Sequence, residues 1–453
     1  MNGHSLICRL GALDTGKVVA RRGNQVTEIN FIAADKRIDF GLGNALDYLA
    51  WKGFEPDERA ADLLLVAALL MAADTRVRRS SESEDRWTRE IELHLPVKDP
   101  KVWTDVGPLL KKTLDFLTGD LWELRFRARP GNLKKLVPAP TRLRIDEPTC
   151  VSLFSGGLDS FVGAIDLLSA GEQPLFVSHY WDGTTSSHQS YCLDRLKAHY
   201  KAKELLSLRA RVGFPSDSVE KNSTENTQRS RSFLFFALAA LAASSLKRKT
   251  TVYVPENGLI ALNVPLDPLR LGALSTRTTH PYYMARWNEL LSDLGVDAVL
   301  ENPYRFQTKG RMVASCKDPQ FLKKHAKDTM SCSHPDGGRY KGESPGHCGR
   351  CVPCLIRRAA LKAGFGSDDT SYKVSNMQAK PLDSKTAEGE NVRSFQLAIS
   401  RLKKRPGLAR VLIHQPGPLS DHSDTDLKRY EAVYRDGLAE VEAILKGVVC
   451  RPL

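Results

Sequence analysis

The sequence predicts an α/β protein whose central domain is a parallel sheet covered by helices on both faces. Three observations carry this prediction. Short apolar runs alternate with helix-spaced segments from residue 141 to about residue 330, as in a series of βαβ units. The first run ends in a turn with two adjacent glycines, and four cysteines gather between residues 332 and 354. We expect an α+β domain over 1–140, the sheet domain with its cysteines over 141–365, and a linker with a helical extension over 366–453.

The composition is that of a folded globular protein. With 453 residues and 42% hydrophobic side chains, the chain has room for two or three domains with buried cores. We find neither an apolar run long enough to cross a bilayer nor a charged N-terminal region followed by an apolar stretch, so we expect a cytoplasmic protein without membrane contact. The net charge of +13 permits nucleic-acid binding, but ATP, an acidic partner or solubility explains it equally well, and nucleic acid is not favoured.

The first 140 residues combine strands and helices without a catalytic arrangement. Three segments alternate apolar and polar residues with a period of two, which predicts half-buried antiparallel strands at 37–42, 88–96 and 122–128. Helical spacing lies between them at 58–71 and 107–117. We expect this domain to hold a partner or a sister subunit. Arg76, Arg78 and Arg79 indicate a solvated helix end and not an anion site, since most charge runs are solvated.

The central domain is expected to bind its ligand at one edge of the sheet. We predict strands at 150–154, 174–180, 205–209 and 251–254, with helices at 161–168, 187–201 and about 227–245. In open parallel sheets, ligands bind beyond the carboxyl ends of the strands, where the strand order reverses. The second strand ends near His179, which either contacts the ligand or is a satisfied strand-end histidine. Beyond the cysteines we expect an exposed polar linker to about residue 390 and helices at 392–404 and 424–446.

The turn after the first central strand has the features of a phosphate-binding loop. It reads Phe154-Ser155-Gly156-Gly157-Leu158-Asp159-Ser160. Two adjacent glycines allow a tight turn and a close approach to a ligand, while Asp159 and Ser160 can cap the following helix. Free N–H groups at that helix start attract an anion. The loop lacks the Gly-Lys-Ser/Thr ending of a Walker loop, which argues against γ-phosphate chemistry. The alternative is a glycine-rich helix start that binds nothing.

The cysteine cluster predicts a metal site. Cys348, Cys351 and Cys354 form two successive Cys-x-x-Cys steps, and Cys332 precedes them. Four such thiolates can complete a tetrahedron around Zn²⁺, and a site filled by four protein ligands is structural. A [4Fe–4S] cluster is a rival for four cysteines. His334 and His347 are alternative ligands, but we expect them beside the metal or exposed, because each is one residue out of the ligand register.

The Ser-Gly-Gly-x-Asp-Ser pattern of residues 155–160 resembles the PP-loop of the ATP pyrophosphatases, which have a Rossmann-like fold of the HUP type and cleave ATP between its α and β phosphates. Together with the four cysteines, it is similar to QueC, the 7-cyano-7-deazaguanine synthase family, and more closely to its longer relatives in bacterial anti-phage operons. The resemblance runs from about Cys150 to Gly364. Arg231 begins a stretch similar to the family's Arg-Asn-x-x-Phe-Leu-x-Leu-Ala-Ala helix, and Lys309 lies where the family has a lysine near the ATP phosphates.

The resemblance implies an ATP-dependent ligase that uses ATP, Mg²⁺ and Zn²⁺. A carboxylate, by resemblance that of 7-carboxy-7-deazaguanine, would be adenylated and passed to an amine, which in the defence relatives lies on a partner protein encoded nearby. The alternatives are nitrile synthesis from ammonia for queuosine, an RNA-modifying PP-loop enzyme and a catalytically dead scaffold. The expected catalytic residues are Ser155, Asp159, Ser160, Arg231 and Lys309, with Mg²⁺ near Asp159; the expected ATP contacts are residues 154–160 and His179.

One departure from the family concerns the substrate pocket. Where QueC enzymes carry Asp-x-Ser-Gly-Tyr-Pro-Asp-Cys-Arg, this chain has Glu256-Asn257-Gly258-Leu259-Ile260 and, further on, an unrelated string over 275–283. The deazaguanine substrate is therefore implied by the resemblance alone and is not indicated by these residues. The added segments at both ends have no counterpart in a minimal QueC, which points to an acceptor larger than ammonia.

Overall fold

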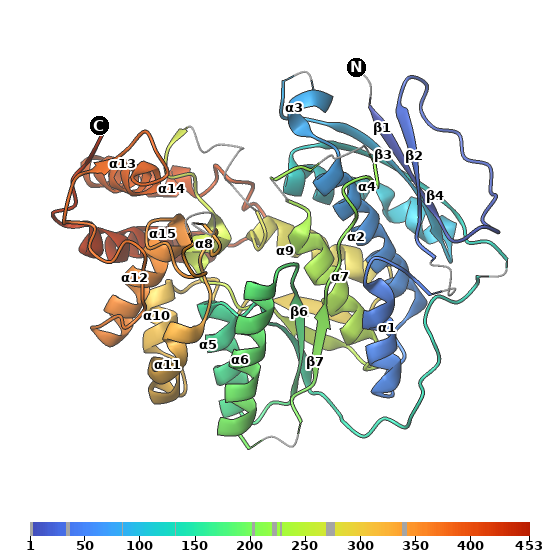
Figure 1. Cartoon of the computed structure of the whole chain (residues 1–453), viewed down its shortest axis with the longest axis horizontal. Helices are drawn as coiled ribbons and strands as arrows, with labels where there is room; N and C mark the ends of the chain where they lie inside the picture. The colour runs from blue at the N-terminus through green and yellow to red at the C-terminus, as the bar shows by residue number, and fades with distance from the viewer. Residues whose placement is uncertain are drawn as a thin grey trace.

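Two parallel sheets and a C-terminal group of helices make up the chain. The structure is a computed structural model, and it describes residues 3–32, 37–83, 85–131, 133–201, 204–219, 224–226, 229–268, 277–337 and 342–453. In Figure 1 the N-terminal sheet (blue), the central α/β region (green to yellow) and the C-terminal helices (orange to red) follow one another across the molecule. The predicted mixed α/β architecture with a parallel central sheet is confirmed. Among the helices described, none is long and apolar enough to cross a membrane.

The N-terminal sheet has the strand order β2-β1-β3-β4, and every neighbouring pair in it is parallel. The antiparallel arrangement predicted for this domain is therefore wrong. Helix α4 fills the connection from β3 to β4, and such a crossover returns the chain to the end where the previous strand began. The elements are β1 His4–Arg9, β2 Gln25–Asn30, α1 Leu42–Trp51, α2 Glu58–Arg76, α3 Arg79–Glu82, β3 Glu90–Val97, α4 Pro100–Thr118 and β4 Leu121–Ala128.

The strand predicted at 37–42 does not form. Ile38 makes only an isolated bridge to Ile32, and a turn then leads into α1. Phe40 and Gly41 both adopt the left-handed backbone region, with φ of 59° and 86°. A Cβ on Gly41 would lie 1.8 Å from the carbonyl oxygen of Arg211, so the close approach of two chain segments requires glycine here and interrupts any extended run.

Arg79 is buried, which corrects the prediction of a solvated helix end for this residue, whereas Arg78 is exposed as predicted. Together with Arg89 it pairs with the carboxylates of Asp74 and Asp120, and none of these four side chains is more than 3% exposed. The Arg79 Nη1–Asp120 Oδ1 and Arg89 Nη2–Asp74 Oδ1 distances are 2.7 and 2.8 Å. Asp74 also accepts a hydrogen bond of 2.7 Å from the Ser230 N–H, directly before α7. Because two cations meet two anions, the buried charges compensate one another and tie α7 to the N-terminal domain.

The central sheet has five parallel strands in the order β7-β6-β5-β8-β9. The strand order reverses between β5 and β8, which makes that edge the expected ligand position. Sequence analysis predicted the first four strands and did not predict β9. The elements are β5 Cys150–Leu153, α5 Leu158–Ser169, β6 Pro174–His179, α6 Gly183–His199, β7 Ser207–Ala210, α7 Arg231–Ser244, β8 Thr250–Tyr253, α8 Gly258–Leu262, α9 Pro281–Asp293 and β9 Ala298–Glu301.

Helices α2 and α7 join the N-terminal domain to the central sheet. Both are apolar on nearly every face, as their sequences require of helices with neighbours all around them. Helix α7 contacts α2 on one side and strands β5, β6 and β8 on the other, and Figure 1 shows the two helices side by side. One continuous hydrophobic core therefore includes strands from both sheets together with α2 and α7.

The C-terminal region is built of helices that pack on the central domain. The segment predicted as an exposed linker is in part buried. Thr370 is 9% exposed, Tyr372 bridges to His347, and Leu382 pairs with Cys450 in a short parallel sheet. The two predicted helices at 392–404 and 424–446 are present as α13 and α15. The elements are α10 Lys309–Ala314, α11 Pro319–His325, η2 Ala326–Asp328, α12 Val352–Phe365, β10 Leu382–Asp383, α13 Glu390–Lys404, α14 Leu408–Leu412, α15 Asp424–Leu445 and β11 Cys450–Arg451.

Candidate active site and metal centre

The glycine-rich turn lies between β5 and α5, at the carboxyl end of the central sheet. Gly156 has a φ of +79°, and a Cβ there would lie 3.0 Å from Gln189 Cγ on α6. Gly157 is the N-cap of α5 without a side-chain cap, so its backbone leaves the first N–H groups of the helix to other partners. Ser155 is exposed at the tip of the turn, and its Oγ lies 3.1 Å from Ser160 Oγ. The two hydroxyls thus flank a helix N-terminus that favours an anion.

A cluster of two carboxyls, an amide and an ammonium lies behind the turn. Asp159 reaches from α5 to Lys309, with 3.1 Å between its Oδ1 and Lys309 Nζ. The Asn257 Nδ2 donates to Asp159 Oδ2 at 2.8 Å and to Glu256 Oε1 at 3.2 Å. Asp159 and Glu256 are also hydrogen-bonded to each other. Asn257 follows β8 and Asp159 follows β5, so the cluster lies at the point where the strand order reverses.

The two carboxyls of this cluster have pKa values shifted in opposite directions, an arrangement that suits one shared proton. Burial and the adjacent Asp159 carboxylate raise the pKa of Glu256 well above its usual value. Burial opposes ionisation of Asp159 as well, but the Lys309 ammonium and the hydrogen bonds from Glu256 and Asn257 hold the pKa of Asp159 below its usual value. Of the two carboxyls, Glu256 is therefore the one that takes up a proton more readily, and a protonated Glu256 can donate a hydrogen bond to the Asp159 carboxylate. A divalent cation can replace that proton, because two adjacent carboxylates are suitable oxygen ligands for Mg²⁺.

Four thiols converge as the sequence predicts. The sulfur atoms of Cys332, Cys348, Cys351 and Cys354 all lie within 4.8 Å of one another. Two of their edges, Cys332–Cys351 and Cys348–Cys354, measure 3.9 Å, close to the edge of about 3.8 Å in a tetrahedron with Zn–S bonds of about 2.3 Å. The N–H groups of Arg350 and Cys351 point at Cys348 Sγ, at 3.5 and 3.3 Å. Donors aimed at sulfur favour thiolates, so this donor set fits a zinc ion.

The two histidines near the cysteines are not members of this cluster. His347 is 4% exposed and its Nε2 accepts a hydrogen bond of 3.3 Å from the Ser331 N–H. Burial lowers the pKa of His347 to about 3, so its ring is neutral and able to accept that bond. His334 is exposed. Both positions agree with the prediction that these histidines lie beside the metal or at the surface.

The segment just before Cys332 links the metal centre to the glycine-rich turn. The Met330 N–H donates to the Gly156 carbonyl at 2.9 Å, and the Leu158 N–H donates to Ser331 Oγ at 3.4 Å. The buried guanidinium of Arg357 on α12 donates to Thr329 Oγ1 at 2.7 Å and to Ser331 Oγ at 3.3 Å. The four cysteines Cys332, Cys348, Cys351 and Cys354 form what we call the cysteine module. Together with α12 it holds residues 329–331, which form one wall of the turn.

The remaining predicted site residues occupy different positions. Phe154 and Leu158 are at most 1% exposed and belong to the core beneath the turn, so only their backbone groups can face a ligand. His179 is also buried, and burial together with the nearby Arg231 lowers the pKa of His179 to about 3. The Arg231 guanidinium lies 4.9 Å from the ring centroid of Trp181. The structure thus groups Arg231 with His179 and Trp181, beside β6, and groups Asp159 with Lys309.

Four polar residues of this site were not predicted from the sequence. Glu256 and Asn257 were noted only as a departure from a family string, although their place after β8 could have indicated a neighbour of the turn. Gln189 is fully buried, and its Nε2 donates to the carbonyls of Ser155 and His179 at 3.4 and 3.3 Å. Ser331 and Gln189 lie in stretches whose spacing carries no signal for such contacts.

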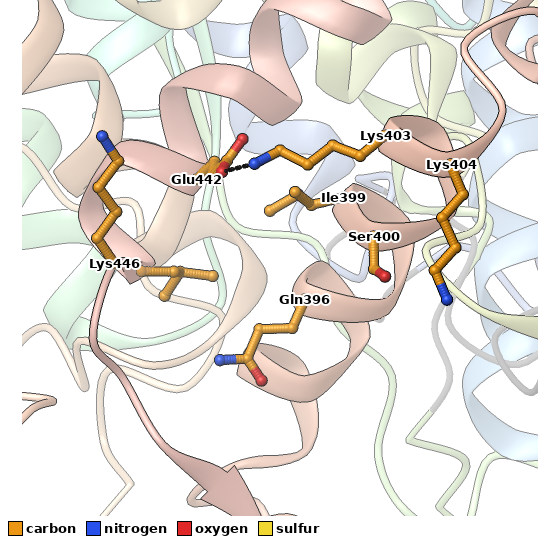
Figure 2. A pocket seen from close by; sticks show the side chains of 8 residues that line it. Gln396, Ile399, Ser400, Lys403, Lys404, Glu442 and Lys446 are labelled. Atoms are coloured by element: carbon orange, nitrogen blue, oxygen red, sulfur yellow. Dashed lines mark hydrogen bonds and ion pairs between the residues drawn. The ribbon is translucent and has the colours of Figure 1, made fainter.

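Three surface grooves are lined by residues outside this cluster. The groove of about 450 Å³ between α13 and α15 is lined by lysines and aliphatic side chains, and Figure 2 shows Lys403 directed at Glu442 across it. The others, of about 350 and 680 Å³, lie on the N-terminal sheet and between α6 and α11.

No protein-family model matches the chain, and a search of curated proteins finds no match. The inference on function therefore depends on the residues of the turn, the carboxyl cluster and the cysteines.

Proposed function

We propose that the protein is an ATP-dependent ligase of the PP-loop ATP pyrophosphatase type, which adenylates a carboxylate and releases pyrophosphate. One observation carries the proposal. A Ser-Gly-Gly-x-Asp-Ser turn lies at the reversal point of a parallel sheet, with the Asp159, Glu256 and Lys309 cluster directly behind it. The turn lacks the Gly-Lys-Ser/Thr ending of a Walker loop, which argues against the β,γ cleavage that P-loop enzymes perform.

The chain's own groups suit each part of this reaction. The backbone N–H groups at the start of α5, with Ser155 and Ser160, can hold phosphate oxygens. Lys309 supplies a cation for the charge that grows on the departing pyrophosphate. When bound, Mg²⁺ would neutralise phosphate charge, and Asp159 and Glu256 are the residues that would hold it. Catalysis in this proposal comes from positioning and charge stabilisation, without a covalent enzyme intermediate.

The bonds formed and broken define the reaction. A carboxylate oxygen attacks the α phosphorus, the bond to the β-phosphate oxygen breaks, and pyrophosphate leaves with the electron pair. An unprotonated amine then attacks the acyl carbon of the mixed anhydride, AMP leaves, and the amine gives up one proton to form an amide. We propose 7-carboxy-7-deazaguanine as the carboxylate and an amine of a partner protein as the acceptor, in an anti-phage setting. Nitrile synthesis from ammonia is the second candidate.

Product analysis tests the ATP chemistry. Purified protein is incubated with ATP, Mg²⁺, the carboxy-deazaguanine and an amine acceptor, which the release of AMP requires, and the nucleotides are separated by chromatography. We expect AMP and pyrophosphate, and a loss of at least about 100-fold in Asp159→Asn, since removing one preorganised charge at a reacting centre typically costs that much. Asp105→Asn, in an exposed ion pair on α4, is the matched control. Formation of ADP and phosphate would contradict the proposal.

Intact-mass spectrometry tests the acceptor. Proteins encoded beside this chain are co-expressed with it and weighed. A partner heavier by one deazaguanine acyl group, and unmodified when Asp159→Asn replaces the wild type, would support conjugation to protein. Release of the free nitrile with ammonium alone, and no modified partner, would support nitrile synthesis instead. Modified RNA with neither product would favour an RNA-modifying enzyme, which the net charge of +13 permits.

A further inference from the structure

Helix α15, near the end of the chain, contacts two of the three segments that supply the cluster of Asp159, Glu256, Asn257 and Lys309. Gly258 directly follows Asn257, and a Cβ on it would lie 2.7 Å from Val433 Cγ1 on α15. Gly437, one turn further along α15, packs so closely on Leu259 that a Cβ would lie 2.8 Å from Leu259 Cδ2. The backbone that presents Glu256 and Asn257 is thus held against α15 by two glycine contacts.

The second contact of α15 joins its Glu440 to the start of α10. Helix α10 has six residues and begins at Lys309. Glu440 Oε2 accepts a hydrogen bond of 3.1 Å from the Gly310 N–H, and Glu440 Oε1 accepts one from the Thr308 hydroxyl. Thr308 in turn caps α10 by accepting from the Arg311 N–H at 3.1 Å. Lys309 lies between the two residues that Glu440 holds.

Close packing at Gly310 makes this arrangement specific. A Cβ on Gly310 would lie between 2.5 and 2.8 Å from the carboxylate atoms of Glu440. Only glycine lets the backbone of α10 approach the carboxylate this closely. A six-residue helix does little to fix its own first residue, because the N–H groups of its first turn have no partner among the backbone carbonyls of the helix. The placement of Lys309 against Asp159 therefore depends on a residue about 130 positions later in the chain.

We propose that Glu440 is a positioning residue for Lys309, and that the C-terminal helix α15 forms part of the active-site architecture. The inference rests on the proposed function for its catalytic consequence. Glu440 acts through the backbone of residues 308–310 and need not touch ATP. The C-terminal region is then required for the phosphate chemistry and is not an accessory for binding partners.

A double-mutant cycle with two readouts tests the proposal. The variants are Glu440→Ala, Gly310→Ala and their combination, with Glu440→Gln as the conservative replacement. Glu442→Gln is the matched control, because Glu442 is two residues away on α15 and pairs with Lys403 in the groove of Figure 2. Hydrogen–deuterium exchange of the peptide over 307–311 reports the local structure and does not require the protein to be enzymatically active. Initial rates of AMP release give kcat and KM for ATP.

We expect Glu440→Ala to speed exchange over 307–311 by about tenfold or more, and to lower kcat by about 10-fold to 100-fold with KM changed less. Glu440→Gln restores most of kcat, since the amide fills the same space and keeps an acceptor. Gly310→Ala is more damaging in the wild type than in the Glu440→Ala background, where the space is free. Wild-type exchange and kcat in Glu440→Ala would overturn the proposal. If the wild-type protein releases no AMP, the proposed function fails, and the exchange data alone judge whether Glu440 holds this segment.

Discussion

At the scale of single residues, the cluster of Asp159, Glu256, Asn257 and Lys309 is the unusual feature of the site. Two neighbouring carboxyls would repel each other if both were ionised, and burial makes that cost larger. Lys309 compensates one negative charge, and the Asn257 amide donates to both acids. The pKa of the second carboxyl, Glu256, is therefore raised. A pair with one exchangeable proton can take up a divalent cation in the proton's place, which suits a site for ATP.

The shared proton predicts a pH dependence of stability. The folded-state pKa of Glu256 lies above its ordinary value of 4.5, so its protonation stabilises the fold at low pH, and this contribution is lost as pH rises from 4.5 through the raised pKa. In Glu256→Gln, which resembles the protonated acid, that loss should be absent. Urea unfolding of both proteins between pH 5 and pH 8 gives the difference. Equal slopes of the free energy of unfolding against pH would contradict the shared-proton arrangement.

At the scale of elements, the cysteine module and α12 act as a brace for the glycine-rich turn. Arg357 on α12 holds Thr329 and Ser331, and Ser331 contacts the first N–H of α5. Cys332, the first of the four cysteines, directly follows Ser331. Loss of the metal is therefore expected to loosen the wall of the turn as well as the module itself, because forming such a site is coupled to folding.

Replacing one ligand tests this coupling. Cys351→Ser should lose a metal content of about one zinc per chain and be destabilised by at least about 3 kcal/mol, since structural zinc contributes on the order of 10 kcal/mol. Metal analysis, thermal unfolding and exchange over 329–331 measure these effects. Cys450→Ser is the control, because Cys450 lies outside the cluster. A soluble, fully active Cys351→Ser protein, or iron with visible absorbance in the wild type, would refute a structural zinc.

At the scale of the whole molecule, the three parts of the chain are not independent. The core that contains α2 and α7 runs without a break from the N-terminal sheet into the central sheet. Helix α15 lies against residues 257–259 and the start of α10, next to the cluster of Asp159, Glu256, Asn257 and Lys309. The added segments at both ends thus support the central domain, whatever surfaces they offer to partners.

The shared core predicts the outcome of a truncation. A fragment that begins at residue 141 would expose the α7 side chains that face α2, at about 1.5–3 kcal/mol for each large apolar side chain. A few such side chains together reach the roughly 5–15 kcal/mol that stabilise a domain. We expect the fragment to aggregate or to lack cooperative unfolding, as circular dichroism and sedimentation would show. A folded fragment that still released AMP would show instead that the N-terminal domain serves only the acceptor.

Local patterns predicted the parts of this molecule that are local in sequence. The glycine-rich turn and the Cys-x-x-Cys steps are each contained in a few residues, and the parallel central sheet follows from its alternation with helices. The helix expected between β3 and β4 allows a parallel crossover but does not require one, and β1 and β2 were not predicted. Contacts between distant segments left no such signal: Asn257 meets Asp159 across 98 positions, and Ser331 meets Leu158 across 173. Only the fold brings these residues together.

Oxygen transfer from the carboxylate to AMP tests the central claim most directly. The carboxy-deazaguanine is labelled with ¹⁸O in both carboxyl oxygens and incubated with the protein, ATP, Mg²⁺ and an amine acceptor. If the carboxylate attacks the α phosphorus, the released AMP carries one ¹⁸O and the amide product keeps the other. Mass spectrometry of AMP reads this result. Unlabelled AMP, or ADP with unlabelled phosphate, would contradict carboxylate adenylation at this site.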